Sequence, residues 1–313
     1  MLEKLFKLKE NGTSVKVEVM AGITTFMTMA YILAVNPNIL SASGMDANAV
    51  LLATALASFL GTVLMALLAN YPFALAPGMG LNAYFAYTVV LNYGYSWQIA
   101  LMAVFAEGLI FIVLSVTNVR EAIFNAIPMT LKSAVSAGIG LFIAFIGLQN
   151  AKIVVNNDST LVSYQNFKTD FSSVGMGALL ALIGVLITGY LLIKKVKGGI
   201  LFGILITWVL GILCELIGIY KPNPELGMYS VIPTALVSFD FSALGNTFGQ
   251  VFKADFGALK SITEFFVVIF AFLFVDIFDT LGTLIGVSSK ANMLDKDGKL
   301  PRIKGALLAD AIA

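Results

Sequence analysis

Long apolar runs separated by short polar segments dominate the chain. Seven runs are close to the ~20 residues that a helix needs to cross the hydrocarbon core of a bilayer, and they occupy 19–40, 48–69, 98–117, 131–148, 174–193, 199–219 and 263–288. An irregular eighth stretch covers 71–92, and a ninth begins near Ile303. The dipeptide Asn36-Pro37 is expected to kink or end the first run. The pattern predicts an all-α polytopic membrane protein.

The composition excludes a soluble protein. Apolar residues make up 59% of the 313 residues and charged residues only 12%, about half of what a soluble domain carries. No basic segment is interleaved with aromatic residues, which argues against nucleic-acid binding. Histidine is absent and Cys214 is the single cysteine, which removes His-based zinc sites, Ser-His-Asp triads and disulfide frameworks. We expect no enzyme, no metal and no cofactor, and a lipid bilayer around the chain.

The positions of lysine and arginine predict the topology. If the N-terminus is cytoplasmic and 71–92 crosses the membrane, 14 of the 19 Lys and Arg residues lie inside and five outside. This asymmetry follows the positive-inside rule and predicts a multi-pass protein of the cell membrane with a cytoplasmic N-terminus. Residues 1–18 are amphipathic and Lys-rich, so we expect them on the cytoplasmic surface. The polar loop 149–172 is expected outside, and the hydrophilic turn 290–304 inside.

The stretch 71–92, YPFALAPGMGLNAYFAYTVVLN, is the most informative part of the sequence. Its two prolines and two glycines oppose a regular helix. We expect an extended piece over 73–76, followed by a half-helix from Leu81 that starts near the middle of the membrane. Free amides and the positive end of the half-helix dipole can then face a polar ligand. The candidate binding residues here are Gly78, Gly80 and Asn82.

Two other interpretations of this stretch stay open. The small residues are also suited to close helix packing in a membrane. The run from Gly78 to Ala83 matches G-x-G-x-x-A, a dinucleotide fingerprint, but its membrane-spanning context differs from a soluble βαβ unit.

Asp276 and Asp279 lie deep in the apolar run FAFLFVDIFDTLGTLIGVSS. A carboxylate at mid-bilayer costs a few kcal/mol even on the mildest scale. Two acids three residues apart share one helical face, and Thr280 and Thr283 extend this polar stripe. Neighbouring buried acids suit reversible protonation, which favours a functional role. The alternative is a pair of helix–helix hydrogen bonds.

Other residues at membrane depth support weaker predictions. Glu107, central in its span, is either a structural partner or a proton-coupling candidate, whereas Glu215 and Glu264 near span ends are expected to be interfacial. Asp310 lies in an incomplete stretch and supports no prediction. The aromatic residues that border the polar features and can stack on a planar ring are Tyr84, Phe85 and Phe278. Packing against lipid or core is their alternative role.

Four runs, GITTFMTMAYILAVNPNIL, ALAPGMGLNAYFAYTVV, FVDIFDTLGTLIGV and ADAIA, resemble the xanthine/uracil permease superfamily, and within it the adenine/guanine/hypoxanthine branch of azaguanine-type purine transporters. The resemblance covers essentially the whole chain. It implies an inverted repeat of seven spans, a core and a gate domain, and substrate held where strands of the third and tenth spans meet. It also implies carboxylates on the eighth and tenth spans. Other branches end their eighth-span motif with an acid where this chain has Thr283.

On the family's plan the chain divides into five parts. We expect a cytoplasmic segment at 1–18, core spans 1–4 at 19–118, gate spans 5–7 at 119–219, an extracellular connection at 220–262, and span 8 with the start of span 9 at 263–313. The third span would be a short strand plus a half-helix. Because the tenth-span carboxylate and the second gate half are missing from this plan, we expect the chain to be C-terminally truncated.

The resemblance implies a secondary active transporter that imports adenine, guanine or hypoxanthine by proton symport. The expected substrate-binding residues are Gly78, Gly80, Asn82, Asp276 and Asp279, and the proton-coupling candidates are Asp276, Asp279 and Glu107. The expected partners are a purine base, the proton and the bilayer, and a homodimer is compatible with the sequence. The alternative is a carrier of anions, or of uracil or xanthine, with the same fold.

Overall fold

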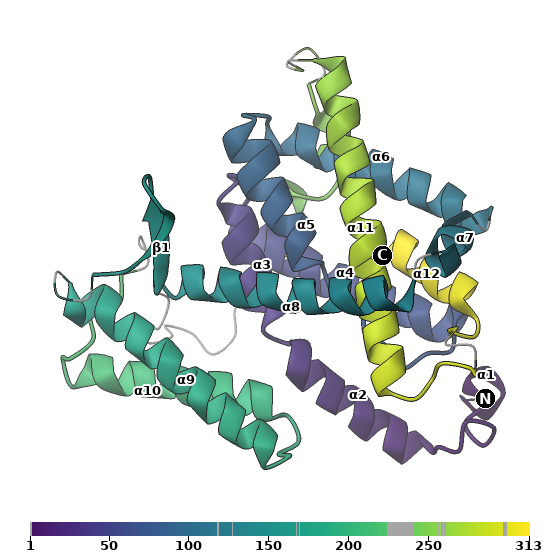
Figure 1. Ribbon diagram of the computed structural model, residues 1–313, viewed down its shortest axis with the longest axis horizontal. Helices are drawn as coiled ribbons and strands as arrows, with labels where there is room; N and C mark the ends of the chain where they lie inside the picture. The colour runs from purple at the N-terminus through teal and green to yellow at the C-terminus, as the bar shows by residue number, and fades with distance from the viewer. Residues whose placement is uncertain are drawn as a thin grey trace. The chain divides into compact units, whose positions relative to one another are not determined.

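The computed structural model describes residues 2–117, 119–126, 128–166, 168, 170–223, 241–255, 257, 259, 261–296 and 299–313. They are mostly helical and form two compact units (Figure 1), the first within 1–22, 32–141 and 240–313 and the second within 23–31 and 142–239. The α-helices are α1 Leu2–Phe6, α2 Val15–Met29, α3 Ile32–Ser41, α4 Ala47–Leu68, α5 Met79–Ala83, α6 Trp97–Val116, α7 Val119–Ala126, α8 Met129–Asn150, α9 Met176–Ile193, α10 Gly199–Leu216, α11 Ile262–Lys290 and α12 Ile303–Ile312. The other elements are π-helices η1 Tyr84–Asn92 and η2 Phe171–Gly175, 3-10 helices η4 Phe241–Asn246 and η5 Gln250–Lys253, and strands β1 Val154–Asn157 and β2 Leu161–Tyr164.

Within the described residues, six helical segments are long and apolar enough to cross a membrane. They are Val15–Ser41, Ala47–Leu68, Trp97–Val116, Phe171–Ile193, Gly199–Leu216 and Ile262–Lys290. Each coincides with a predicted run to within four residues at either end. The remaining run, 131–148, falls in α8, which contains a shorter apolar stretch, Ala137–Asn150. A polytopic helical membrane protein is therefore supported by the length and composition of its helices.

The first run breaks at a different place from the predicted one. α2 ends at Met29 and α3 begins at Ile32, whereas Pro37 lies inside α3. Proline removes one backbone hydrogen bond from a helix. Here the neighbouring Asn36 is buried and its side chain is hydrogen-bonded on both sides, so tertiary contacts hold this part of α3 in place.

Residues 70–78 carry the chain from α4 to α5 without regular secondary structure, as predicted for the broken stretch. α4 ends as Asn70 takes a left-handed conformation with φ of 52°, which asparagine tolerates better than most residues. The extended backbone is held against α4, because the amide of Leu75 donates to Oγ1 of Thr62 at 3.0 Å. The helix resumes at Met79, two residues earlier than predicted, and no strand forms in this segment.

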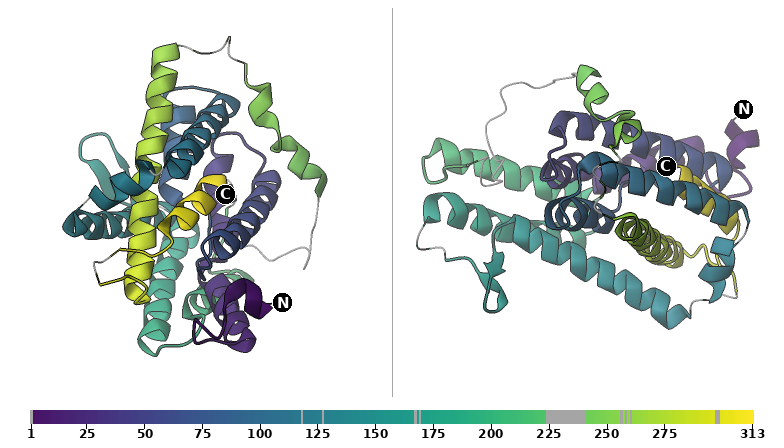
Figure 2. Two further views of the ribbon diagram at one scale, coloured as in Figure 1. Left: turned by 90° about the vertical axis from the view of Figure 1, so that its right-hand side faces the viewer. Right: turned by 90° about the horizontal axis from the view of Figure 1, so that it is seen from above.

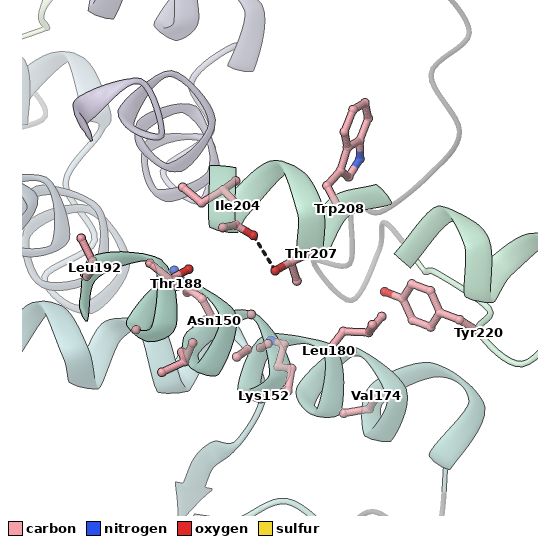
Figure 3. Close-up of a pocket in the computed structure, with 17 residues that line it drawn as sticks. Asn150, Lys152, Val174, Leu180, Thr188, Leu192, Ile204, Thr207, Trp208 and Tyr220 are labelled. Atoms are coloured by element: carbon pink, nitrogen blue, oxygen red, sulfur yellow. Dashed lines mark hydrogen bonds between the residues drawn. The ribbon is translucent and has the colours of Figure 1, made fainter. Parts of the chain in front are cut away.

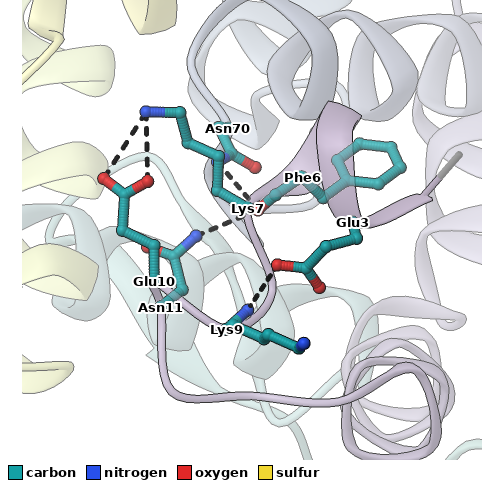
Figure 4. Close-up of polar contacts among 7 residues, drawn as sticks. All are labelled: Glu3, Phe6, Lys7, Lys9, Glu10, Asn11 and Asn70. Atoms are coloured by element: carbon teal, nitrogen blue, oxygen red, sulfur yellow. Dashed lines mark hydrogen bonds and ion pairs between the residues drawn. The ribbon is translucent and has the colours of Figure 1, made fainter.

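The start of this segment is tied down from two sides. In Figure 4 the side chains of Asn70 and Asn11 both donate to the carbonyl of Phe6, at 3.1 and 3.0 Å. The Tyr71 hydroxyl donates to the carbonyl of Pro301, and the guanidinium of Arg302 lies 4.8 Å from the centre of the Tyr71 ring. The N-terminal segment and the turn before α12 thus fix the point at which the extended backbone begins.

The first unit packs its helices around two apolar clusters. α11 lies against α6, α12 against α4 and α6, and α3 against α4 and α5. Three of these helices begin with a side chain that accepts an amide hydrogen bond, namely Asp46 for α4, Ser96 for α6 and Ser261 for α11, as expected for N-caps. One cluster is centred on Ile39, Val89, Ala103 and Phe272, and the other on Met65, Ile285, Ala306 and Leu307.

The second unit is built on the hairpin of α9 and α10, which run side by side in Figures 1 and 2. The predicted polar loop 149–172 contains an antiparallel β-hairpin in the register Val154↔Tyr164, which the sequence pattern did not reveal. In the predicted connection 220–262, residues 224–240 lie outside the described residues.

Candidate substrate site

A cavity of about 310 Å³ lies wholly inside the first unit, at the lower end of the size range typical of small-molecule sites. It forms where α3, α4, α5, α6, α11 and α12 meet the extended segment. Its polar lining residues are Ser58, Asn82, Glu107, Asp276 and Asp310, and its aromatic ones are Phe85 and Phe272. Polar groups from five helices therefore converge on one cavity in a largely apolar unit.

The predicted site residues are brought together only in part. Those that line the cavity are Gly78, Asn82, Asp276 and Glu107. Gly80 and Asp279 do not line it. Glu107, for which the sequence left a structural and a functional role open, is only 6% exposed and borders the cavity from α6.

The predicted aromatic residues also divide. Phe85 is buried and lines the cavity. Tyr84 instead packs edge-on against Phe272, with ring centres 5.0 Å apart, and Phe278 packs edge-on against Phe274 at 4.8 Å. Phe85 follows Asn82 by three residues and both line the cavity, whereas Tyr84 is turned towards Phe272.

Asn82 is joined to a chain of buried hydrogen bonds. Its Nδ2 donates to Oδ1 of Asn36 at 2.5 Å, and Nδ2 of Asn36 donates to Oγ1 of Thr54 at 2.7 Å. The Thr54 hydroxyl donates to the carbonyl of Val50 at 2.7 Å. The backbone amide of Asn82 is also engaged, because it donates to the carbonyl of Gly78 at 3.1 Å. The backbone N–H of Asn82 is therefore not available to a ligand, whereas the side chain lines the cavity.

Asp279 lies just behind the cavity lining and contacts the backbone of Gly78. A Cβ at position 78 would lie 2.5 Å from Oδ2 of Asp279, closer than real Cβ atoms approach an oxygen. Glycine at this position therefore allows the α11 carboxyl group to approach the extended backbone just before α5. The carboxyl groups of Asp279 and Asp310 are also near enough to interact electrostatically.

Asp310 is a site residue that the sequence analysis did not predict. It lines the cavity from α12, and its Oδ2 accepts a hydrogen bond from the buried Thr280 hydroxyl at 2.7 Å. Thr280, which lies on the predicted polar stripe of α11, therefore hydrogen-bonds to an acid on α12. Thr283, which was expected to continue this stripe, is exposed. The run ADAIA, which carries part of the family resemblance, was the available signal for Asp310.

Ser58 and Phe272 were missed as well. The Ser58 hydroxyl is buried and has no hydrogen-bond partner among the described residues, although it borders the cavity. Phe272 is 1% exposed and forms an aromatic wall of the cavity together with Phe85. A serine and a phenylalanine in apolar spans carry no signal of their own, so only the tertiary fold reveals them.

The charges of the lining are of one sign. Three carboxyl groups, those of Glu107, Asp276 and Asp310, border the cavity, and no lysine or arginine is among the described residues that line it. The carboxyl groups of the lining can therefore accept hydrogen bonds from a ligand.

The acids predicted to be interfacial lie elsewhere. Glu264 in the first turn of α11 accepts a hydrogen bond from the Tyr95 hydroxyl at 3.1 Å and does not line the cavity. Glu215 lies on α10 in the second unit, near the end of that helix as predicted.

A larger cavity, about 670 Å³, lies in the second unit along α9 and α10. Figure 3 shows its labelled polar residues, among them Asn150, Lys152 and Thr207, with the Thr207 hydroxyl bonded to the carbonyl of Gly203 at 2.7 Å. None of the described residues that line it is acidic, and most of its lining is apolar. The smaller cavity is therefore the better candidate for chemistry.

Residues 16–313 match the Permease family. The chain belongs to the xanthine/uracil permease family. Members of this family are transporters, not enzymes.

Several relatives of this permease have named substrates. It is 44% identical to the guanine/hypoxanthine permease PbuG of Bacillus subtilis over 99% of its own length and 67% of that protein. It is 39% identical to the adenine permease AdeP of Escherichia coli over 100% of its own length and 65% of that protein. The chain thus spans about two thirds of the length of these relatives. The names confirm the purine branch suggested by the sequence motifs.

Proposed function

We propose that this permease takes part in the import of purine nucleobases coupled to protons, as a secondary active transporter. The observation that carries the proposal is the convergence of Asn82, Asp276 and Glu107 with two phenylalanine rings on one cavity beside a broken helix. The names of the relatives supply the substrate class, adenine, guanine or hypoxanthine.

The cavity has the chemistry that a purine base requires. A flat heterocycle can pack against the rings of Phe85 and Phe272, since aromatic groups favour stacked or edge-on contacts. The N–H groups of the base can donate to Asp276, Asp310 or the Asn82 side chain. An anion carrier would need donors in the cavity, so a lining of three carboxyl groups without a cation argues against that alternative.

The proposed proton coupling would use the same carboxyl groups. When a neutral base enters and displaces water, ionised acids lose solvation unless they bind a proton or a donor. Asp276 is the first candidate because it lines the cavity, and Glu107 is the second. Asp279 lies behind Gly78 and does not line the cavity, so it would not touch the base.

We extend the proposal to the architecture of the transporter. The helices at 19–118 and 263–313 would form the core domain and those at 119–219 the gate, in an inverted seven-span repeat that alternates access by movement of the gate against the core. The broken stretch 71–92 would serve as the third span, with the N-terminus in the cytoplasm.

Uptake of labelled hypoxanthine, guanine and adenine, with and without an uncoupler, tests the proposal in cells that lack their own purine uptake. We expect uptake of at least one base, its loss with the uncoupler, and a reduction of about tenfold or more in Asp276→Asn and Asn82→Ala, which each remove a direct contact. Glu264→Gln is the control, because it keeps an acceptor for Tyr95 away from the cavity. No uptake of any base would reject purine transport, wild-type rates in both variants would reject the site, and insensitivity to the uncoupler would reject proton coupling.

A further inference from the structure

The hydrogen-bond chain behind Asn82 joins three elements at a nearly solvent-free point. Asn36 on α3 and Thr54 on α4 are each 3% exposed, and Asn82 follows on α5. Neither Asn36 nor Thr54 lines the cavity. Buried polar groups of this kind are costly unless every donor and acceptor is matched, so the direction of each bond matters.

The direction starts at Thr54. Its hydroxyl carries a single proton, and that proton is used in the bond to the carbonyl of Val50. Towards Asn36 the hydroxyl can then only accept. The NH₂ group of Asn36 must face Thr54, and the Asn36 carbonyl oxygen must face Asn82.

We propose that Asn36 and Thr54 are positioning residues that fix the amide of Asn82, so that its NH₂ group is held by Asn36 and its carbonyl oxygen is presented to the substrate. The inference rests on the proposed function and adds to it a rule of selectivity. One N–H of the Asn82 amide is then used by Asn36, and the Asn82 carbonyl oxygen accepts a hydrogen bond from the ligand. The ligand must offer an N–H group at that edge, in line with a lining that already consists of carboxyl acceptors.

Binding to the purified protein tests the inference, with hypoxanthine and its 1-, 7- and 9-methyl derivatives as competitors. In the wild type, methylation of the N–H group that faces Asn82 should weaken binding about tenfold or more, because a buried acceptor then stays unpaired. Thr54→Val removes the group that sets the direction, so the Asn36 and Asn82 amides can turn. In this variant we expect the logarithm of the affinity ratio between unmethylated and methylated base to fall by at least half. If the methyl group acted only by its size, this ratio would be the same in the variant as in the wild type.

Two controls separate positioning from general damage. Thr54→Ser restores the hydroxyl and should restore wild-type selectivity. Thr117→Val removes a hydroxyl that makes the same kind of bond, to the carbonyl of Val113 at 2.8 Å, at an exposed helix end, and should change nothing. The inference is overturned if Thr54→Val keeps wild-type selectivity, or if the wild type itself rejects none of the methylated bases, a result that needs no variant to fold. Failure of the wild type to bind any purine would instead contradict the proposed function.

Discussion

Gly78 marks the point where the two polar features of the sequence meet. An added Cβ would collide with the end of the Asp279 side chain, so the carboxyl group would have to turn away from its place behind the cavity. We expect Gly78→Ala to lower purine uptake by up to about tenfold, because displacing the carboxyl group beside the proposed site costs on the order of 1 kcal/mol. Gly108→Ala on α6 is the matched control, because nothing lies within 4 Å of its added Cβ. Equal uptake by the two variants, at equal amounts in the membrane, would show that the contact with Asp279 is unimportant.

The site residues that could be predicted from the sequence are polar residues inside apolar runs. Asn82 and Asp276 are visible because an amide or a carboxyl group inside an apolar run is costly and needs a reason. Ser58 and Phe272 do not contrast with an apolar span, and their roles depend on helices that are distant in sequence. The displacement of Asp279 from the lining is also tertiary, since a helical face alone does not tell which of two acids meets the cavity.

At the scale of elements, the α9–α10 hairpin rests on a reciprocal contact. Each helix carries Gly-x-x-x-Thr, and the threonine of one helix lies on the glycine of the other, Thr207 on Gly184 and Thr188 on Gly203. At Gly203 an added Cβ would lie 2.9 Å from Cβ of Thr188, so the helices would have to separate. We expect Gly203→Ala and Gly184→Ala each to destabilise the protein by about 1–3 kcal/mol, seen as a lower unfolding temperature in detergent.

Gly189→Ala on α9 controls for the general effect of alanine in a membrane helix. Nothing lies within 4 Å of its added Cβ, so it should be neutral or stabilising by up to about 1 kcal/mol, the difference in helix propensity. Destabilisation by Gly189→Ala as large as that by Gly203→Ala would mean that the close helix contact is not the cause.

The positions of the long helices followed from the sequence because the length of an apolar run is a local property of the chain. The break of 70–78 was also predictable, since its prolines restrict the backbone whatever surrounds them. The interruption between α2 and α3 was not. No proline or glycine stands at residues 30 and 31, whereas Pro37 is tolerated where Asn36 is held by its neighbours. The hairpin of β1 and β2 was hidden in the same way, because its short strands lack a regular alternation.

At the scale of the whole molecule, the side of the membrane on which each loop lies depends on whether 71–92 counts as a crossing. With it, five spans separate the N-terminus from the β1–β2 turn and eight separate it from the turn after α11. Without it, four spans precede the β1–β2 turn and seven precede the turn after α11. Both of these turns then change sides, while the N-terminus stays on the same side. The asymmetry of lysine and arginine favours the first arrangement.

Single cysteines at exposed positions decide between these arrangements. In a Cys214→Ser background, which removes the native thiol, Glu10→Cys, Ser159→Cys and Ala291→Cys would be treated in intact cells with a membrane-impermeant maleimide. We expect labelling of position 159 alone, and labelling of positions 10 and 291 only after permeabilisation. Labelling of 291 with 159 protected would mean that 71–92 enters and leaves on one side, and labelling of 10 and 291 together would invert the orientation. A half-helix can present its first turn to a substrate in both arrangements, so the site alone does not distinguish them. The labelling pattern shows whether the broken stretch 71–92 crosses from one face of the membrane to the other.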